Sequence, residues 1–343
     1  MNENIYTFPA IKGIQAGTEY FVSMVPLSVV PKLFSFSGND LPAEMRSQRI
    51  LNKSRIPEMK KYILDNPDSY VFSSLTVSVD GPIEFTPVNS STDNTLGTIS
   101  IPMSARLLLN DGQHRKAAIE AALQEKQSLR FETISIVFFH DLGLEKSQQM
   151  FSDLNRYAIR PTKSINVLFD SRDRLAVELC EIIEELPFFR GWVEKEKSTL
   201  ANRSKALYTL SGLYHGTEAL INGLNLDAKK EKETIQQFWT EVYNNTNEWQ
   251  DVIKGVSHSS EIRKRSLCGH SIYLVAVSNV GNKIIKKGNE FSHYLQKLPN
   301  IDFRKNNPIW DGTIVVKNQI SGTRVNINNL TNIIEKELFL SQD

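Results

Sequence analysis

Residues 106–123, RLLLNDGQHRKAAIEAAL, decide the fold of the first part of this chain. An apolar run of strand length ends at Asp111-Gly112, and good helix formers with apolar residues at helical spacing follow it. The pattern predicts a strand, a tight turn and a helix. Glycine adopts backbone angles closed to other residues, and the first turn of a helix leaves amide N–H groups without partners. We expect this corner to attract an anion.

Three polar side chains gather on the predicted turn. Gln113, His114 and Arg115 directly follow the glycine, and the planar fork of Arg115 suits a phosphate or a carboxylate. The dipole of the following helix also favours a bound anion. The simpler alternative is that Asp111 caps the helix and that Arg115 pairs with a surface acid. Capping would need only Asp111, so the grouping of the three side chains favours an anion site.

These residues also carry a resemblance to a known family. The box Asp111-Gly112-Gln113-His114-Arg115 resembles the signature of the DGQHR-domain proteins, and the chain as a whole resembles the DndB family of bacterial DNA phosphorothioation gene clusters. Further matches to the family pattern are residues 151–156 (FSDLNR), 161–164 (PTKS), 202–204 (NRS) and 301–304 (IDFR). The ordered set spans most of the chain, which makes the resemblance stronger than the box alone.

The resemblance implies a fold and a site. It implies a domain like those of the ParB and sulfiredoxin superfamily, with phosphate or nucleotide bound by Gly112, Gln113, His114 and Arg115, and with Arg156 and Lys163 completing the pocket if residues 155–163 fold back on the box. In a nucleotide hydrolase using a nucleoside triphosphate with Mg, Asp111 could hold the ion or orient water and Asn155 could assist. Gln113 stands where sulfiredoxin has its reactive cysteine, which argues against peroxiredoxin repair.

Length and element order indicate two domains in this chain of 343 residues. We expect an α/β (α+β) domain at residues 1–170, because strands and helices are mixed there. Residues 171–343 read as a mainly helical domain with a helix at 267–280 that breaks near Gly281, and a short hairpin from 314–320 and 324–327. Trp239 and Trp249 are most simply core residues, with stacking on nucleic-acid bases as the alternative.

Charge is balanced over the whole chain but not along it. The net charge is +1, so a nucleic-acid partner would need a local basic face. Between residues 250 and 310, ten basic residues stand against four acidic ones. We therefore expect DNA contacts there, and a solvated surface is the alternative for every cation concerned. The candidates are Arg263, Lys264, Arg265, Lys283, Lys286 and Lys287, together with Arg46, Arg49 and Arg55 in the first domain.

Several classes of protein are disfavoured. The two cysteines are far apart, no two histidines have the i, i+4 spacing of a metal pair, and no Walker-type phosphate loop occurs, so we expect no metal site. No signal peptide or membrane span is evident, and we expect a cytoplasmic protein without a membrane partner. The resemblance implies a DNA-binding regulator, a repressor acting at the promoter of the phosphorothioation operon. The alternatives are a DNA-stimulated NTPase and a scaffold for other phosphorothioation proteins, and the chain could form a homo-oligomer.

Overall fold

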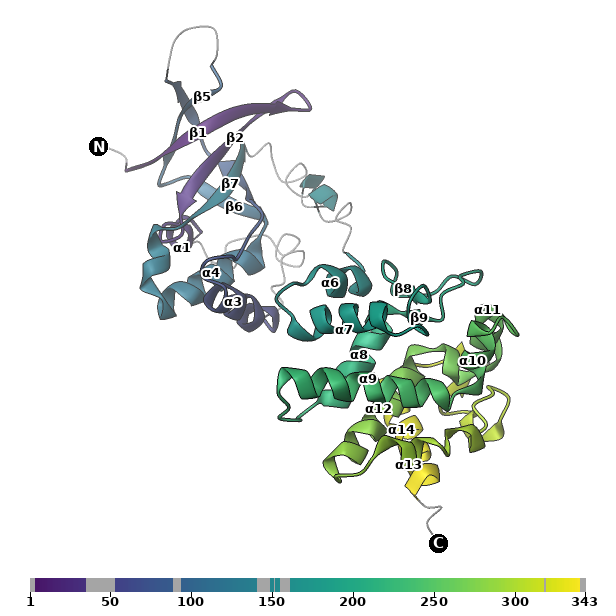
Figure 1. Cartoon of the computed structure of the whole chain (residues 1–343). Helices are drawn as coiled ribbons and strands as arrows, with labels where there is room; N and C mark the ends of the chain where they lie inside the picture. The colour runs from purple at the N-terminus through teal and green to yellow at the C-terminus, as the bar shows by residue number, and fades with distance from the viewer. Residues whose placement is uncertain are drawn as a thin grey trace. The chain divides into compact units, whose positions relative to one another are not determined.

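The computed structural model describes residues 4–34, 53–88, 94–140, 149–150, 152–154, 161–317 and 319–339. Contacts between residues divide the chain into two compact units, Met1–Ile159 and Arg160–Asp343 (Figure 1).

The described part of the first unit is built on a seven-stranded sheet with the strand order β4-β5-β1-β2-β7-β3-β6. Neighbouring strands are antiparallel, except that β3 and β7 run parallel. The strands are β1 (Ile5–Gln15), β2 (Thr18–Pro26), β3 (Leu75–Asp80), β4 (Glu84–Pro87), β5 (Leu96–Pro102), β6 (Arg106–Asp111) and β7 (Thr133–His140).

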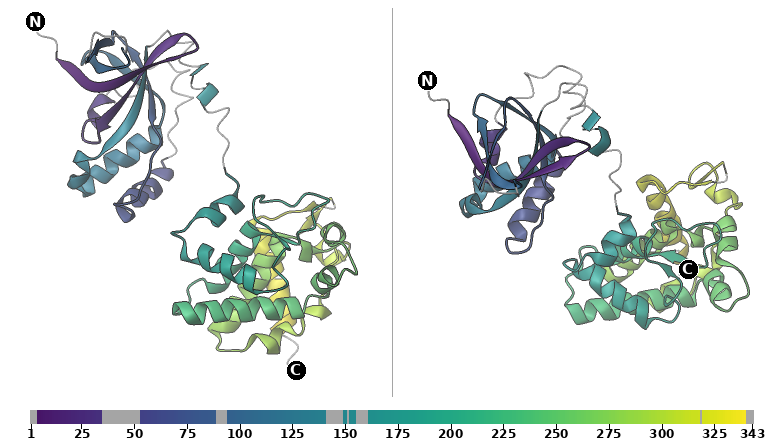
Figure 2. Two further views of the ribbon diagram at one scale, coloured as in Figure 1. Left: turned by 45° about the horizontal axis from the view of Figure 1, so that its top comes forward. Right: turned by 90° about the horizontal axis from the view of Figure 1, so that it is seen from above.

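Short helices lie together on one side of this sheet (Figures 1 and 2). They are α1 (Val30–Leu33), α3 (Arg55–Asp65), α4 (Gln113–Glu125) and the 3-10 turn η2 (Gln127–Phe131). Helix α4 buries Ala118, Ile119 and Ala122 in the same hydrophobic cluster as Val77 of β3 and Ile136 of β7. Helix α4 also packs against α3, α1 and η2.

The described part of the second unit is mainly helical. Its helices are α6 (Lys163–Phe169), α7 (Arg174–Glu185), α8 (Leu210–Ile221), α9 (Ala228–Asn244), α10 (Asn247–Ile253), α11 (Ser259–Arg265), α12 (Ser271–Lys286), α13 (Phe291–Leu295) and α14 (Arg324–Phe339), with the 3-10 turns η3 (Leu267–Gly269), η4 (Leu298–Asn300) and η5 (Pro308–Trp310). Four two-residue strands make two small pairs, β8 (Val193–Glu194) with β9 (Tyr208–Thr209) and β10 (Val315–Val316) with β11 (Gln319–Ile320).

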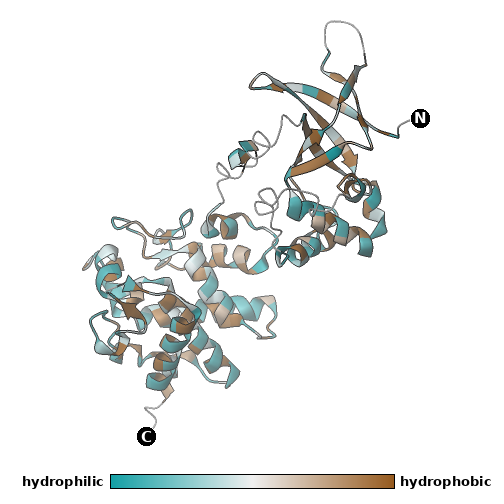
Figure 3. Ribbon diagram, turned by 180° about the vertical axis from the view of Figure 1, so that it is seen from behind, coloured by the Kyte–Doolittle hydropathy of each residue, from teal (hydrophilic) through white to brown (hydrophobic). Residues whose placement is uncertain are grey.

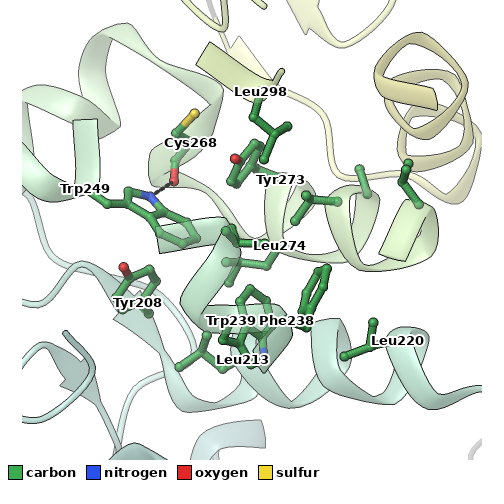
Figure 4. Close-up of a cluster of buried hydrophobic side chains, with 14 of the residues drawn as sticks. Tyr208, Leu213, Leu220, Phe238, Trp239, Trp249, Cys268, Tyr273, Leu274 and Leu298 are labelled. Atoms are coloured by element: carbon green, nitrogen blue, oxygen red, sulfur yellow. Dashed lines mark hydrogen bonds between the residues drawn. The ribbon is translucent and has the colours of Figure 1, made fainter. Parts of the chain in front are cut away.

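Aromatic residues form the core of this unit (Figure 4). Trp239 and Trp249 are fully buried, which confirms the core interpretation and leaves neither indole available to a base. The indole Nε1–H of Trp249 donates to the carbonyl of Cys268 at 2.9 Å, and that of Trp239 donates to Thr217 Oγ1 at 3.0 Å. Buried indoles need such partners. Figure 3 shows hydrophobic residues in the strands of the first unit and alternating with hydrophilic ones along the helices of the second.

The mixed α/β class predicted from the sequence is confirmed, but two predicted elements are wrong. Helix α12 does not break near Gly281 but continues through it to Lys286. The hairpin is shorter than predicted, because β10 and β11 account for all of it and residues 324–327 are the first turn of α14. The Arg-Val-Asn-Ile alternation of that turn is too short to separate a strand from the start of a helix.

Candidate functional site

The predicted corner between strand and helix is present. Strand β6 ends at Asp111, α4 begins at Gln113, and Gly112 between them has a positive φ of 105°. A Cβ at this position would overlap the side chain of Leu75. Both the backbone conformation and the close approach of β3 therefore require glycine.

Arg115 holds this corner to the strand beside it. Its Nη1 donates to the main-chain carbonyls of Ser73 at 2.8 Å and Ser74 at 3.1 Å, and also contacts Ser73 Oγ. Its Nη2 donates to Asp111 Oδ2 at 2.5 Å. Only 13% of the arginine side chain is exposed. The guanidinium thus links the start of α4 to the residues that lead into β3.

Asp111 is the partner of Arg115 rather than the helix cap. The N-cap residue of α4 is Gly112, which has no side chain to cap with. The alternative in which Asp111 caps the helix is therefore wrong, although the part of it that pairs Arg115 with an acid is right. The acid is Asp111 itself, one turn earlier in the chain.

The other two side chains of the box are partly buried. Gln113 Nε2 donates to the carbonyls of Leu109 at 3.0 Å and Asn110 at 3.3 Å, which folds the amide back over the end of β6. Burial, and after it the positive charge of Arg55, lower the pKa of His114 below its ordinary value of 6.5. The imidazole is therefore neutral at pH 7, so His114 can offer a hydrogen bond but not a charge.

The structure thus brings Arg55, at the start of α3, within electrostatic reach of the box. Lys163 belongs to the second unit, where it begins α6 and is exposed. The predicted site residues Arg46, Arg49, Asn155 and Arg156 lie outside the described residues.

Most of the predicted DNA-binding cations of the second unit have protein partners. Lys283 pairs with Glu335 at 2.6 Å, Lys286 donates to the carbonyl of Asn222 at 3.0 Å, and the Lys287 ammonium lies 3.9 Å from the centre of the Phe339 ring. Arg263 is half-buried and donates to the carbonyls of Ala201, Ser204 and Ala206 at 2.8–3.0 Å.

Lys264 and Arg265 are exposed on α11, and Arg265 makes a long ion pair of 3.8 Å with Glu261. The loop that Arg263 binds carries two further exposed cations, Arg203 and Lys205. We call Arg203, Lys205, Lys264 and Arg265 the α11 basic surface. Sequence reasoning missed the two loop residues because they are about sixty positions away from α11 in the chain. The NRS match at 202–204 was the one signal that pointed to this loop.

Two further properties concern the described residues only. No group of three or more His, Cys, Asp or Glu side chains among them is arranged to hold a metal ion. None of the helices in the described part of the chain combines the length and the apolarity needed to cross a bilayer.

Together these features define a two-unit protein, in which an α/β sheet unit carries a glycine-cornered polar box and a helical unit carries a group of exposed cations. The family model of the DndB proteins, described as DNA-sulfur modification-associated, matches residues 8–341. The chain therefore belongs to the DndB family, and this membership connects it with DNA sulfur modification. No curated protein and no solved structure was found to match it.

Proposed function

We propose that this protein binds DNA and represses transcription of the phosphorothioate modification gene cluster. Membership of the DndB family supports the connection with DNA sulfur modification. The observation that carries DNA binding is the α11 basic surface, where four exposed cations lie on two segments that Arg263 joins. The net charge of the chain is only +1, so attraction to DNA has to come from such a local group.

The physical basis of this proposal is phosphate neutralisation. Lys and Arg side chains that contact phosphates release condensed counterions, so the affinity falls as salt is added. Exposed cations without close acidic partners contribute most to this effect. Lys264 and Arg265 meet that condition better than Lys283, whose charge is already matched by Glu335 at 2.6 Å. Phosphate contacts supply affinity, and recognition of an operator requires base contacts in addition.

The test is fluorescence anisotropy with a labelled duplex from the promoter of the gene cluster, titrated at several salt concentrations. Replacing Lys264 and Arg265 together by Ala should weaken binding at least about tenfold and reduce the slope of log affinity against log salt by about two. The control replaces Lys229 and Lys230 of α9, which are exposed and carry the same charge, and should leave both quantities unchanged. If the two variants had the same DNA affinity and the same dependence on salt, DNA binding at the α11 basic surface would be contradicted.

A promoter–reporter assay then separates the regulator from a scaffold. Loss of DNA binding in the Lys264 and Arg265 variant should raise expression from the promoter. Copurification of the protein with other phosphorothioation proteins in the absence of DNA, with unchanged promoter activity in the variant, would favour the scaffold.

The proposal includes a phosphate- or nucleotide-binding role for the box, in a ParB-like arrangement, as the resemblance implies. Arg115 can contact a phosphate there only if its bonds to Asp111 and the two serines open or are shared. The alternative function, DNA-stimulated hydrolysis of a nucleoside triphosphate with Mg, would use Asp111. Turnover that requires promoter DNA and is lost in Asp111→Asn, with DNA binding intact, would favour the NTPase. Absence of turnover with every metal and nucleotide would leave the box a binding or structural element.

A further inference from the structure

A small polar cavity lies within the second unit, where the loop before β9, helix α11 and the start of α12 meet. Its volume is about 280 Å³. Arg263, Lys264 and His270 line it, together with several hydroxyl groups and the amide of Asn202. None of its lining residues is Asp or Glu. The wall of the cavity is therefore positively charged, and the residues that line it contain no acid to balance that charge.

Arg263 is fixed in this wall with donors to spare. Its bonds to the carbonyls of Ala201, Ser204 and Ala206 use three of the five N–H groups of a guanidinium, and the other two have no partner among the described residues. Carbonyl oxygens orient the group but do not neutralise it. Lys305 adds a second cation nearby, because its Nζ donates to the Arg263 carbonyl at 2.7 Å. Burial lowers the pKa of both side chains, and no carboxylate among the described residues opposes this effect.

The start of α12 contributes a second source of positive potential. This helix has sixteen residues, and its N-cap residue, His270, makes no capping hydrogen bond with its side chain. The imidazole Nε2–H instead donates to the Arg263 carbonyl at 2.8 Å. Ser271, the first residue of the helix, is exposed and lines the cavity. The positive end of the helix dipole is thus directed at the same space as Arg263.

Tyr208 is an unusual residue of this wall. It lines the cavity, it is 2% exposed, and its hydroxyl has no hydrogen-bond partner in the described structure. In Figure 4 this hydroxyl points away from Leu213 and lies on the side of Trp249. Buried polar groups almost always have a partner, and this hydroxyl, whose oxygen is itself covered, is an exception among the residues around the cavity.

We propose that this cavity binds the phosphate group of a small phosphate monoester, such as a nucleoside monophosphate. The two spare N–H groups of Arg263, on Nε and Nη1, and the start of α12 would donate to the phosphate oxygens, and the apolar side chains of Leu200, Leu207 and Leu274 would contact the organic part. The volume is at the lower end of ligand pockets, which favours a small ligand. This cavity lies in the second unit and the DGQHR box in the first, and Lys264 belongs both to the cavity wall and to the α11 basic surface.

Isothermal titration calorimetry of the full chain tests this site with three probes: inorganic phosphate, AMP and dimethyl phosphate. Inorganic phosphate and AMP should bind saturably to a site that the cavity variants described below weaken, and dimethyl phosphate, a monoanionic diester like the DNA backbone, should bind to that site at least about tenfold more weakly. Equal binding of dimethyl phosphate would assign the cavity to backbone phosphates and overturn the monoester proposal. Absence of saturable binding of both phosphate and AMP would overturn the site altogether.

The variant Ser271→Asp tests whether phosphate and AMP bind in this cavity. An acidic residue at the first helical position stabilises a helix, so the fold should be kept while the added charge weakens phosphate and AMP binding more than about tenfold. Ala228→Asp adds the same charge at the first residue of α9, outside the cavity, and should leave the affinities for phosphate and AMP unchanged. Asn202→Asp, an isosteric change in an exposed loop, provides a second cavity variant with the same expected loss. Unchanged binding in both cavity variants would contradict the proposal.

Discussion

Asp111 and Arg115 lie one helical turn apart and form an ion pair of 2.5 Å between Oδ2 and Nη2. The aspartate side chain is 42% exposed, whereas the arginine is largely covered. Solvent therefore reaches the pair from the acidic side. An anion that approaches the box meets a carboxylate before it meets the guanidinium, so binding at Arg115 has to compete with Asp111.

Replacing Arg115 by Ala should destabilise the first unit by about 2–3 kcal/mol, because the carbonyls of Ser73 and Ser74 lose a charged donor. Urea unfolding followed by far-UV circular dichroism measures this loss. Tryptophan fluorescence serves as an internal control, since all four tryptophans lie in the second unit and their transition should not move. Lys116→Ala, which breaks the neighbouring pair with Glu120, should cost less than about 0.5 kcal/mol. A similar loss in both variants would contradict the role given to Arg115.

Gly112→Ala should be more costly than an ordinary glycine substitution at positive φ. Strain in the backbone and overlap with Leu75 add at this position, and we expect a loss of about 3 kcal/mol or more in the free energy of unfolding. Gly191 has a φ of 79° and open space around it, so Gly191→Ala measures the backbone term alone, about 1 kcal/mol. If the two losses proved equal, the contact with Leu75 would have no energetic weight.

Arg263→Ala and Arg265→Ala should behave differently. Arg263 holds residues 201–206 through three carbonyls, so its loss should lower the stability of the second unit by about 1–3 kcal/mol and displace Arg203 and Lys205. Arg265 is exposed, so its replacement should reduce DNA affinity with little change in stability, within about 0.5 kcal/mol. Thermal unfolding beside anisotropy titrations separates the two effects. Loss of stability in Arg265→Ala would contradict the assignment of a structural role to Arg263 and of a DNA-binding role to Arg265.

Glu178 should make the second unit less stable as the pH rises. Burial, and then the charge of Glu231, raise the pKa of Glu178 above its ordinary value of 4.5, and its Oε1 is buried without a partner. Below the pKa that Glu178 has in the unfolded chain, both the folded and the unfolded state hold the proton, so this group does not change the free energy of unfolding. As the pH rises past that value only the unfolded state releases it, so stability falls until the folded pKa is passed.

Glu178→Gln should therefore gain stability relative to the natural chain as the pH increases from about 4 to 7. Urea unfolding at a series of pH values measures the difference. Glu233→Gln removes an exposed charge on α9, the helix that also carries Glu231, and should show no such trend. A gain in stability that is independent of pH would mean that the titration of Glu178 is not its cause.

Local signals in the sequence account for the bounds of some elements. Pro57 and the Asn66-Pro67 pair mark the beginning and end of α3, which spans Arg55–Asp65, and the glycine corner at Gly112 is where the pattern placed it. In both cases the signal is a residue whose backbone preference is independent of its neighbours in space.

Other features depended on packing and could not be predicted in this way. Gly281 reads as a helix break, yet α12 continues because the missing Cβ lets Phe238 and Leu220 approach the helix. The charge of Arg263 predicted an exposed side chain, but its direction is set by three carbonyls about sixty residues earlier in the chain. Such contacts between distant segments leave no periodic signal in the sequence.

The place of β7 in the sheet has a consequence for biosynthesis. This strand is the last of the seven to leave the ribosome, yet it lies inside the sheet between β2 and β3. Until residues 133–140 emerge, β2 and β3 each expose a hydrogen-bonding edge that another nascent chain could pair with. The first unit is thus most prone to aggregate in the interval before β7 is translated, and its completion has to wait for that strand.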